Sequence, residues 1–562
     1  MKRLLVTAAL PYSNGRPHVG HVAGCYLAAD TYVRYQRLTG RDVRFVCGSD
    51  DHGVAIVLSA DREGKTPAEV AEYYGKIQKE DFESLGIHFD VYSSTSRNPY
   101  HAQTSQNFFL ELYKKDYFEK KSTEQFYDPV KKQFLPDRFV KGVCGYCSTP
   151  DQNGDQCENC GKVLDSTTLL EAKSVLSGEP AVVRETVHWF LDLSRFSTVV
   201  EEWLDGATIR EHTRNYVKGL LSSGLIQRSM TRDLSWGIPV PLDEPEAEGK
   251  VLYVWFDAPI GYISNTMELC AERDGDCQLY SKWWKDDECD ILHFIGEDNT
   301  IFHCVIWIAM LSAEGSFRLP EGVIVNQFLN IQFPNKNEAE KISKSRGTAI
   351  WIGDYIRQGG NPDTLRYYLT AIAPEKSRAV YKPEDLVQRN NADLANTLGN
   401  FVNRIISFTK KYCGDSVPRA HSEQLNEVDR AYVELREKAF STLSQQLDTF
   451  QFKPALETAM EFARASNRYV DELAPWKTRK DDMVRTEATL KIALDSIWFL
   501  GVVLCPFIPF SSEKILALFG KTLSEISWSD ALEPVPVGSP LQEPVIIFQK
   551  MEASDWIPEE SV

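Results

Sequence analysis

The sequence predicts an α/β protein with a doubly wound parallel sheet, followed by a helical bundle. Residues 3–10 read as a short buried strand, His18 to Arg37 as a helix and Asp42 to Cys47 as a second strand. Strand, helix and strand within about 45 residues are typical of a parallel, Rossmann-like sheet. The pattern resumes further along, where we expect strands at 251–262, 290–298 and 321–330.

Two other parts of the chain differ from this pattern in their periodicity and composition. From residue 386 onward the chain is mainly amphipathic helix, as at 421–446 and 484–505, which predicts a separate all-α bundle. Residues 116–230 show weak helical periodicity and are rich in turn residues, aromatics and cysteine pairs, so we interpret them as an insertion. Residues 533–562 contain five prolines and are expected to form an extended tail.

The composition excludes a disordered or fibrous chain and argues against a membrane protein. Of the 562 residues, 43% are hydrophobic and 25% are charged, which is ample for packed cores. No stretch of about 18 or more apolar residues occurs, so we expect no membrane span. With 62 basic and 80 acidic residues, the net charge is −18. So acidic a chain does not bind nucleic acid by bulk charge, and we expect no DNA partner. Any RNA must be recognised through local patches and shape.

Four of the twelve cysteines form two close pairs, Cys144 with Cys147 and Cys157 with Cys160, and the rest are scattered. This is not a disulfide framework, and it predicts a reduced, cytoplasmic protein with one metal site. Two such knuckles can close a tetrahedral thiolate site with no open position, so we expect one structural Zn²⁺. Four unrelated buried cysteines and a redox pair are the alternatives, and the spacing favours neither.

Two histidines flank a glycine where the first strand turns into the first helix. The segment begins at Pro11 and ends with His18-Val19-Gly20-His21. A helix start holds phosphate because its N–H groups are free and carry partial positive charge, and imidazoles there can donate to phosphate oxygens. Gly20 lets a ligand approach the backbone closely. A pair of surface histidines explains this motif equally well when it is taken alone.

A second polar motif, Lys341-Ile342-Ser343-Lys344-Ser345, places two lysines three residues apart among small side chains. Such a loop suits a mobile clamp for a polyphosphate, although a solvated loop is the better reading of this motif alone. Together, the two motifs resemble the paired HIGH and KMSKS signatures of class I aminoacyl-tRNA synthetases, here HVGH and KISKS. Their order, separation and expected secondary structure agree with that resemblance.

Longer stretches resemble one family within that class. They are ALPYSNGRPHVGHVAG, FLPDRFVKGVC, YVWFDAPIGY, HFIGED and NRYVDELAPW. YVWFDAPIGY alone could be an aromatic-rich core strand, but beside the other motifs it resembles the substrate strand of methionyl-tRNA synthetases. The resemblance covers almost the whole chain, which is identified as a member of that family. It implies a ligase that activates L-methionine with ATP to methionyl-adenylate and transfers it to tRNA(Met), for translation initiation and elongation.

The resemblance implies roles for individual residues. It assigns phosphate and transition-state contacts to His18 and His21, and contacts to the leaving pyrophosphate to Lys341 and Lys344. The implied ATP site comprises Tyr12, His18, Gly20, His21, Gly296, Asp298, Lys341, Ser343 and Lys344. The implied methionine pocket comprises Leu10, Tyr12, Asp50, Trp255, Ala258, Pro259, Tyr262 and His303. Asp50 would pair with the substrate ammonium, while Trp255 and Tyr262 would wrap the thioether.

The positions of these residues support the assignment independently. Asp50, the segment 253–262 and HFIGED are expected at or just beyond strand carboxyl ends, where open α/β sheets form their ligand crevice. An ordinary turn residue is the alternative for Asp50. In the bundle, the resemblance implies anticodon contacts by Asn400, Arg404 and Trp476, and stacking on splayed bases is how single-stranded RNA is read. A core tryptophan is the alternative for Trp476.

Three features depart from the family pattern. Ile342 replaces the usual methionine of the lysine loop, Asn299 stands where some members have an apolar residue, and 333–340 is an extra polar stretch. The chain stops soon after the bundle and lacks the C-terminal RNA-binding domain by which some relatives dimerise, so we expect a monomer. ATP is expected to bind with Mg²⁺.

These expectations divide the chain into five segments. They are the first half of a catalytic nucleotide-binding domain at 1–115, a connective insertion with the zinc knuckle at 116–230, the second half of the catalytic domain with the KISKS loop at 231–385, an α-helical anticodon-binding domain at 386–532, and a C-terminal tail at 533–562.

Other class I synthetases and a non-catalytic tRNA-binding protein are the rival functions on the sequence alone. A cysteine-specific class I synthetase would hold zinc in its catalytic site, but the four cysteines here form a closed set away from the pocket segments. The isoleucine, valine and leucine enzymes need an editing domain, and 116–230 is small for one that also holds a zinc module. A non-catalytic tRNA-binding protein has no need of a pyrophosphate clamp, which argues against that reading.

Overall fold

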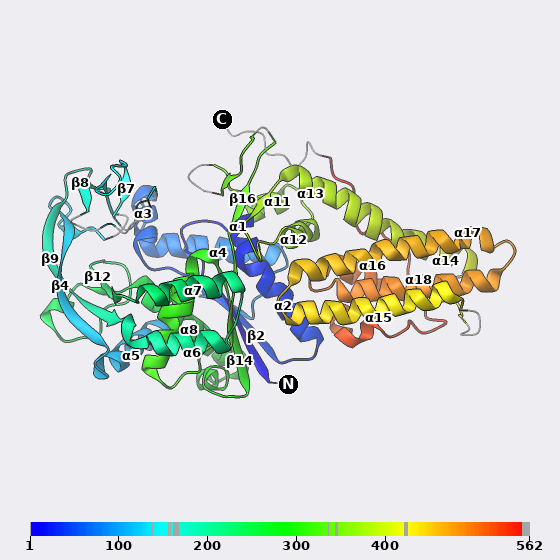
Figure 1. Ribbon diagram of the computed structural model, residues 1–562, viewed down its shortest axis with the longest axis horizontal. Coiled ribbons are helices and arrows are strands. Elements are labelled where there is room, and N and C mark those ends of the chain that lie inside the picture. The colour runs from blue at the N-terminus through cyan, green and yellow to red at the C-terminus, as the bar shows by residue number, and fades with distance from the viewer. Residues whose placement is uncertain are drawn as a thin grey trace.

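The computed structural model describes residues 2–136, 139–154, 157, 159–160, 164, 168–334, 336–342, 347–420 and 425–552. It has a sheet-based body, a β-rich extension at one end and a helical bundle at the other (Figure 1). Among the described residues, no helix combines the length and apolar character needed to cross a membrane.

The body is built on a six-stranded parallel sheet with the order β10-β15-β14-β1-β2-β3. The strands are β1 Arg3–Ala8, β2 Val43–Ser49, β3 Val91–Ser94, β10 Thr208–Ile209, β14 Cys289–Gly296 and β15 Gly322–Asn326. The strand order reverses between β1 and β14. The strands β2 and β3 follow β1 on one side, whereas β14 and β15 lie on the other side of β1. Ligands bind outside the carboxyl ends of the strands at such a switch point. The predicted doubly wound fold is confirmed.

The first crossover is one continuous helical segment, α1 Val19–His21, η1 Val22–Tyr26 and α2 Leu27–Leu38. Its middle turn is π-helical, a form that is frequent at functional sites. The other main helices of the body are α3 Val54–Glu63, α4 Pro67–Ser84, α5 His101–Lys114, α6 Ser197–Gly206, α7 Glu211–Ser223, α8 Val254–Asp274, α10 Trp307–Glu314, α11 Ile352–Arg357 and α12 Pro362–Ala371. The helix expected from His18 to Arg37 is therefore confirmed.

The strand expected over 251–262 is wrong. Only Val251–Leu252 is a strand, β13, and the segment continues as the 21-residue helix α8. A continuous apolar run does not distinguish a buried strand from a buried helix by periodicity, and nearly all of the first half of α8 is buried. Pro259 lies inside this helix.

The β-rich extension holds the cysteine pairs. Its long strands, β4 Phe118–Asp128 and β9 Val182–Asp192, pair antiparallel, and a separate small sheet contains β6 Val140–Cys144, β7 Gln152–Asn153 and β8 Leu169–Ser174. The apolar core of this small sheet packs against Val54, Val57 and Leu58 of α3. Within the segment 116–230, β10 pairs with β15 in the central sheet.

The all-α bundle predicted after residue 386 is confirmed. It contains α13 Pro383–Arg389, η8 Asn390–Gly399, α14 Asn400–Cys413, α15 Glu427–Asp448, α16 Phe452–Leu473, α17 Pro475–Thr478, α18 Met483–Val503 and α19 Pro509–Ala517. The described residues after 532 are extended, as expected, but they dock on the bundle. Val417 N–H donates to Ser539 O at 2.9 Å, and Asn391 and Met551 exchange two hydrogen bonds.

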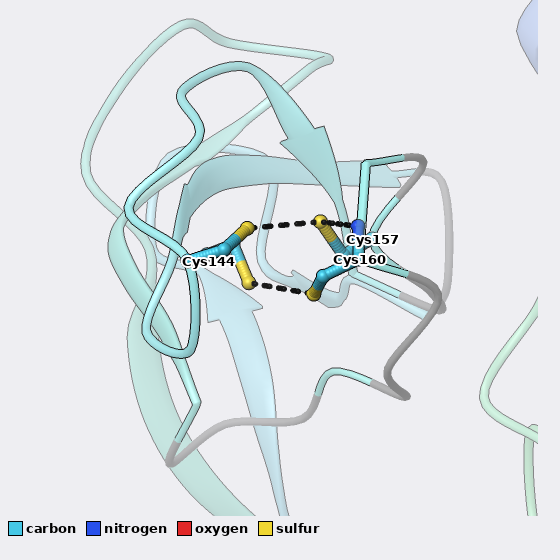
Figure 2. Close-up of side chains that lie close together, drawn as sticks. Cys144, Cys157 and Cys160 are labelled. Carbon is cyan, nitrogen blue, oxygen red and sulfur yellow. Dashed lines mark hydrogen bonds between the residues drawn. The ribbon is translucent and has the colours of Figure 1, made fainter.

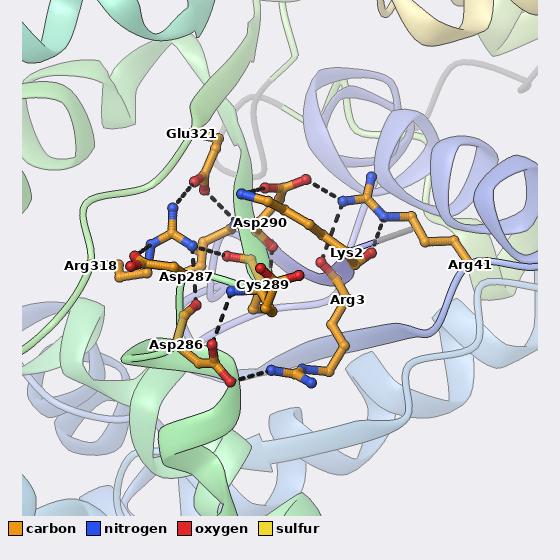
Figure 3. A network of polar contacts seen from close by, with 11 residues as sticks. Lys2, Arg3, Arg41, Asp286, Asp287, Cys289, Asp290, Arg318 and Glu321 are labelled. Carbon is orange, nitrogen blue, oxygen red and sulfur yellow. Dashed lines mark hydrogen bonds and ion pairs between the residues drawn. The ribbon is translucent and has the colours of Figure 1, made fainter.

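The amino edge of the central sheet, opposite the switch-point edge, carries a network of charged side chains (Figure 3). Arg3 pairs with Asp286 at 2.5 Å, and Arg41 pairs with Asp290. Glu321 pairs with Arg318 and also accepts the backbone N–H of Ile291 at 2.7 Å. These contacts tie the starts of β1 and β14 together and leave the carboxyl edge free for ligands.

Arg366 on α12 joins the sheet-based body to the bundle and is fully buried. Its guanidinium donates to Asp30 Oδ2 on α2 at 2.6 Å and to the carbonyls of Pro506 and Phe507 at 3.0 and 2.8 Å. If the side chain were removed, both carbonyls would lose this donor, whereas Asp30 Oδ2 would retain Arg34 Nε, which donates to it at 2.8 Å.

We predict that Arg366→Leu lowers the free energy of unfolding by about 1.5–3 kcal/mol, because it removes one of the two guanidinium partners of the buried Asp30 carboxylate and one donor to each of two buried carbonyls. Arg357→Leu is the control: Arg357 is 61% exposed in its pair with Asp354, so its removal should cost less than about 1 kcal/mol. Urea unfolding of both variants is the measurement. An equal decrease in the free energy of unfolding in the two variants would contradict a structural role for the buried pair of Arg366 and Asp30.

Candidate functional site at the carboxyl edge of the sheet

His18 and His21 cap the first helix with their ring nitrogens. His18 Nδ1 accepts the backbone N–H groups of Gly20 and His21 at 3.1 and 3.3 Å, and His21 Nδ1 accepts that of His18 at 3.1 Å. The two rings stack with centroids 3.7 Å apart. Because both Nδ1 atoms accept, the proton of each neutral ring resides on Nε2. Each imidazole therefore retains one N–H donor that the helix does not use.

Both imidazoles are held in the neutral form. Desolvation, reinforced by His21, lowers the pKa of His18 well below its usual range. His21 is exposed, yet desolvation by the protein around its ring lowers its pKa to about 4. At neutral pH the pair therefore offers two neutral donors at a helix start that already favours anions.

Gly20 is required by the stacked rings and by the lysine loop. A Cβ at this position would lie 2.9 Å from His18 Cε1 and 3.3 Å from Ile342 Cδ1. Ile342, the residue that departs from the family pattern, is buried. The segment after the lysine loop also pairs with the histidine motif, since Val19 N–H donates to Ile350 O at 3.0 Å. The two motifs thus meet at one place.

Lys341 lies in β17 Glu340–Lys341, which pairs with β16 Leu329–Ile331. Its Nζ is 5.3 Å from the centroid of the Phe328 ring. Across the site, loss of solvation raises the pKa of Asp298, an effect that the Lys341 ammonium opposes. Lys341, Gly296 and Asp298 therefore lie near one another at the carboxyl end of β14. Ser343 and Lys344 lie outside the described residues.

Asp50 ends β2 beside the histidine motif and is buried. Burial, with the nearby carboxylates of Asp257 and Asp51, holds the pKa of Asp50 well above its usual range. Its Oδ1 has no hydrogen-bond partner among the described residues. A carboxyl group in this setting favours a bound cation, because a positive charge would restore its ionised form.

Aromatic rings enclose the space next to Asp50. Trp255 stacks face to face on Phe302 with centroids 3.7 Å apart, and Tyr12 meets Trp255 edge to face at 6.2 Å. Tyr12 also lies close to Asp50, to which its backbone is bridged. Together, these rings form an aromatic cluster beside Asp50.

Tyr262 and His303 form a polar pair deeper in the same region. His303 Nδ1 lies 3.1 Å from Asn299 O, so Nδ1 carries the proton and Nε2 accepts from the Tyr262 hydroxyl at 2.8 Å. Burial lowers the pKa of His303 to about 4 and raises that of Tyr262. The pair is therefore neutral. Asn299 takes part through its backbone carbonyl.

The remaining pocket residues predicted from the sequence lie on the same elements. Ala258 and Pro259 are buried in the first turns of α8, between Trp255 and Tyr262. Leu10 follows β1 and approaches Gly261 so closely that a Cβ there would lie 2.8 Å from Leu10 Cδ1. The helix α8, rather than a strand, therefore presents this side of the predicted pocket.

The three predicted RNA-contacting residues lie on α14 and α17 of the bundle. The Arg404 guanidinium lies 5.5 Å from the centroid of the Trp476 ring and donates to Asp471 at 3.0 Å. Trp476 is half-buried and packs against the bundle core, so it is neither fully exposed nor a buried core residue. Asn400 is exposed, one helical turn from Arg404.

The four cysteines converge, and Cys144, Cys157 and Cys160 point toward one another (Figure 2). Cys144 and Cys160 have sulfur atoms 3.8 Å apart, those of Cys147 and Cys157 are 3.6 Å apart, and all four lie within 4.8 Å of one another. Sulfurs bound at about 2.3 Å to one tetrahedral ion are about 3.8 Å apart, so the cluster can bind a metal ion. Thr149 and Asn159 approach the Cys147 sulfur as outer donors.

Sequence reasoning missed several residues of the site. Phe302, which stacks on Trp255, precedes His303 in a π-helical turn, η7 Phe302–Ile306, that the sequence does not announce. Trp351 faces His18 with ring centroids 6.0 Å apart. His52 and Asp257 form a buried pair behind Asp50. Only His52 carried a signal, since it lies in the polar Gly-Ser-Asp-Asp-His-Gly turn.

Comparison with known families matches this arrangement. A family model described as tRNA synthetases class I (M) matches residues 4–406. Another, described as the anticodon binding domain of methionyl tRNA ligase, matches residues 417–558. The chain belongs to the methionyl-tRNA synthetase family. Its fold, its paired motifs and its cysteine cluster are those expected of a member.

Individual relatives agree along nearly the whole chain. A methionine–tRNA ligase of Porphyromonas gingivalis is 44% identical over 558 residues, covering 98% of this chain and 79% of that protein. The same enzyme of Bacteroides fragilis is 42% identical over 556 residues with the same coverage. Methionyl-tRNA synthetase of Mycobacterium tuberculosis in complex with methionyl-adenylate is 27% identical, with a TM-score of 0.79, covering 98% of this chain and all of that one.

We predict a pH dependence of stability from His303. Its folded pKa of about 4 is below the unfolded value, so the unfolded chain binds more protons and stability falls as the pH drops from 6.5 toward 4. Between pH 7 and pH 5, the protonation of His303 should lower the free energy of unfolding by about 2 kcal/mol. Urea unfolding at both pH values should show a flatter dependence for His303→Gln. An unchanged slope would contradict a neutral, buried His303.

Proposed function

We propose how this methionine–tRNA ligase carries out its two steps, the activation of L-methionine with Mg²⁺–ATP and the transfer of the methionyl group to tRNA(Met). In the first step a methionine carboxylate oxygen attacks the α-phosphorus, and the bond to the β-phosphate breaks to release pyrophosphate. In the second step, the hydroxyl of the terminal ribose attacks the carbonyl carbon of the adenylate and AMP leaves. No protein nucleophile is needed, so catalysis rests on positioning and charge stabilisation.

The observation that carries this proposal is the pair of neutral Nε2–H donors at the start of the first helix. We assign His18, Gly20 and His21 to the ATP phosphates, because donors and helix polarity converge there. Lys341, with Lys344 of the same motif, would neutralise the leaving pyrophosphate. The close approach of Ile342 to the Gly20 position supports our assignment of the lysines of this motif to the same site.

The rest of the ATP site is assigned to Tyr12, Gly296, Asp298 and Ser343. Gly296 ends β14 at the switch point, and Asp298 follows near Lys341. This is the edge at which doubly wound sheets bind nucleotides.

We assign methionine to the region beside Asp50. The Asp50 carboxylate would bind the α-ammonium, and the stacked Trp255 would contact the thioether, a sulfur–aromatic contact favourable by about 0.3–1.5 kcal/mol. The neutral Tyr262–His303 pair offers no charge to the thioether end. Leu10, Ala258 and Pro259 would complete the apolar wall.

We further propose that the cysteine cluster holds one structural Zn²⁺ through Cys144, Cys147, Cys157 and Cys160. Four sulfurs leave no open position, so the ion would fold the small sheet rather than take part in the reaction. That sheet packs on α3, the helix that follows the Asp50 turn. The zinc module would therefore hold α3 in place and, through α3, the turn that carries Asp50 of the methionine site.

We propose that Asn400, Arg404 and Trp476 recognise the anticodon of tRNA(Met). The supporting features are a half-exposed tryptophan with an arginine against its ring, and an exposed amide on the neighbouring turn. In this scheme the segments 1–115 and 231–385 form the catalytic domain, 116–230 the connective insertion, 386–532 the anticodon-binding domain and 533–562 the tail.

Removing one donor to developing charge typically costs about 10²–10³ in rate. We predict that His21→Ala slows adenylate formation by this factor while the affinity for methionine changes little. Single-turnover adenylate formation and methionine binding measured separately provide the test. Loss of methionine binding with an unchanged rate in the bound complex would contradict the assignment.

For the metal, we predict that the purified protein contains one zinc ion per chain and that Cys157→Ser lowers this content. Because the small sheet supports α3, the variant should also have a higher KM for methionine. Cys277→Ser is the control, since that cysteine lies outside the cluster. Metal analysis and pyrophosphate exchange are the measurements, and full zinc content in Cys157→Ser would contradict the site.

For RNA, we predict that Trp476→Ala weakens tRNA(Met) charging and leaves tRNA-independent pyrophosphate exchange unchanged. Base stacking on an aromatic ring is worth about 1–3 kcal/mol, so KM for tRNA should rise about 5- to 150-fold. Tyr412→Ala, another aromatic change in the bundle, is the comparison. Impaired exchange in Trp476→Ala would indicate a structural role instead.

A further inference from the structure

A buried histidine–aspartate pair lies directly behind the proposed ammonium site. His52 Nδ1 and Asp257 Oδ2 are 2.9 Å apart, and their side chains are 7% and 0% exposed. Burial alone would lower the pKa of His52, but the Asp257 carboxylate outweighs it and raises that pKa. The steps proposed above give this pair no role. A buried ion pair is costly to maintain, so its position within the pocket calls for a physical explanation.

The surroundings of the pair consist largely of hydrogen-bond acceptors. The Ser264 hydroxyl donates to Gly261 O at 3.1 Å and lies 2.9 Å from His101 Nδ1, so His101 carries its proton on Nδ1. His101 Nε2 is then a bare acceptor, and neither it nor Asp257 Oδ1 has a partner among the described residues. Ring and carboxylate atoms of these residues lie within 4.8 Å of one another. Because His52 Nδ1 bonds directly to Asp257, the group is already organised around the His52 proton rather than a metal ion.

His52 links the two halves of the proposed methionine pocket. It lies two residues after Asp50 in the same turn, and its backbone N–H opposes the rise in pKa of the Asp50 carboxyl, which would hold the α-ammonium. Its imidazole binds Asp257 in the first turn of α8, the helix that carries Trp255 and Tyr262 against the side chain. The Trp236 ring packs on the imidazole at 5.6 Å, and Trp236 Nε1 donates to Asp51 O at 2.6 Å. One residue therefore bridges the turn that binds the amine and the helix that binds the thioether.

We propose that His52 is a positioning residue that sets the distance between the ammonium-binding carboxylate of Asp50 and the aromatic wall on α8, and thereby selects amino acids by length. This inference rests on the methionine site assigned above. An apolar pocket by itself distinguishes one methylene by only about 10- to 200-fold. A fixed separation between the two anchors increases that discrimination, because a longer or shorter side chain cannot satisfy both ends at once.

The position of the donor atom provides a sharp pair of variants. An asparagine at residue 52 places an amide N–H where the His52 Nδ1 proton lies and can keep the bond to Asp257. A leucine has similar volume but no donor. We expect His52→Leu to raise the KM for methionine by about 10- to 100-fold, the effect of losing a hydrogen bond to a buried charge. His52→Asn should stay within about threefold of the parent protein, less than the tenfold change that 1.4 kcal/mol produces.

Selectivity separates this role from a merely structural one. The substrates are methionine and ethionine, which has one extra methylene, in tRNA-independent pyrophosphate exchange on the full chain. In His52→Leu, the ratio of kcat/KM for methionine over ethionine should fall about tenfold, within the range that one methylene contributes. KM for ATP should not change, because the His52 side chain contacts none of the ATP-site residues that the structure describes.

His188→Leu is the matched control. His188 is also a fully buried histidine paired with an aspartate, since its Nε2 lies 3.0 Å from Asp233 Oδ2, but its strand β9 lies in the extension. The His188→Leu variant should be less stable than the parent protein, but its ratio of kcat/KM for methionine over ethionine should not change. If His52→Leu does not fold, His52→Gln replaces it, because a glutamine amide extends toward the Nε2 position and misses Asp257.

Three outcomes overturn the inference. The first is an unchanged KM for methionine in His52→Leu or its replacement, and the second is a KM for methionine raised as much in His52→Asn as in His52→Leu. The third is an unchanged ratio of kcat/KM for methionine over ethionine in His52→Leu. Asp50→Asn distinguishes the two levels of the argument. If Asp50→Asn raises the methionine KM while His52→Leu does not, the methionine site stands and only the positioning role fails. If Asp50→Asn also leaves the KM unchanged, the assigned site and this inference both fail.

Discussion

Two histidine rings that cap a helix with their Nδ1 atoms constrain most of the candidate site. Their bonds to backbone N–H groups fix the tautomer of each ring, and desolvation keeps both rings neutral. The glycine between them cannot be replaced without a clash, and that same position receives Ile342 from the lysine loop. The cap therefore orients the two Nε2–H donors, and the position of Gly20 determines where Ile342 of the second motif packs.

The other parts of the molecule hold this edge of the sheet in place. Charged pairs join the amino ends of β1 and β14, so the carboxyl ends meet at the switch point with a fixed separation. The cysteine-containing sheet packs behind α3, and α3 follows the turn that presents Asp50. Arg366 anchors the bundle to α2, the continuation of the capped helix. Distant segments of the chain thus act on one small region.

Much of this could be predicted from the sequence because it depends on local patterns. The strand and helix around His18, the closed set of four cysteines and the helical bundle all follow from periodicity and spacing. The α8 helix was mistaken for a strand because a buried apolar run has no diagnostic period. The stacking of Trp255 on Phe302 and the pairing of His52 with Asp257 join residues far apart in the chain, and only the fold brings such residues together. The docking of residues 533–552 on the bundle likewise depends on tertiary packing that an extended, proline-rich segment does not reveal.

The site proposed here would activate methionine by forming methionyl-adenylate. The most direct measurement is ATP–pyrophosphate exchange without tRNA, run separately with each of the twenty amino acids. Exchange that depends on methionine and is negligible with the other nineteen is the result predicted here. Exchange with a different amino acid, or none with methionine, would contradict the assignment of the pocket formed around Asp50 and Trp255.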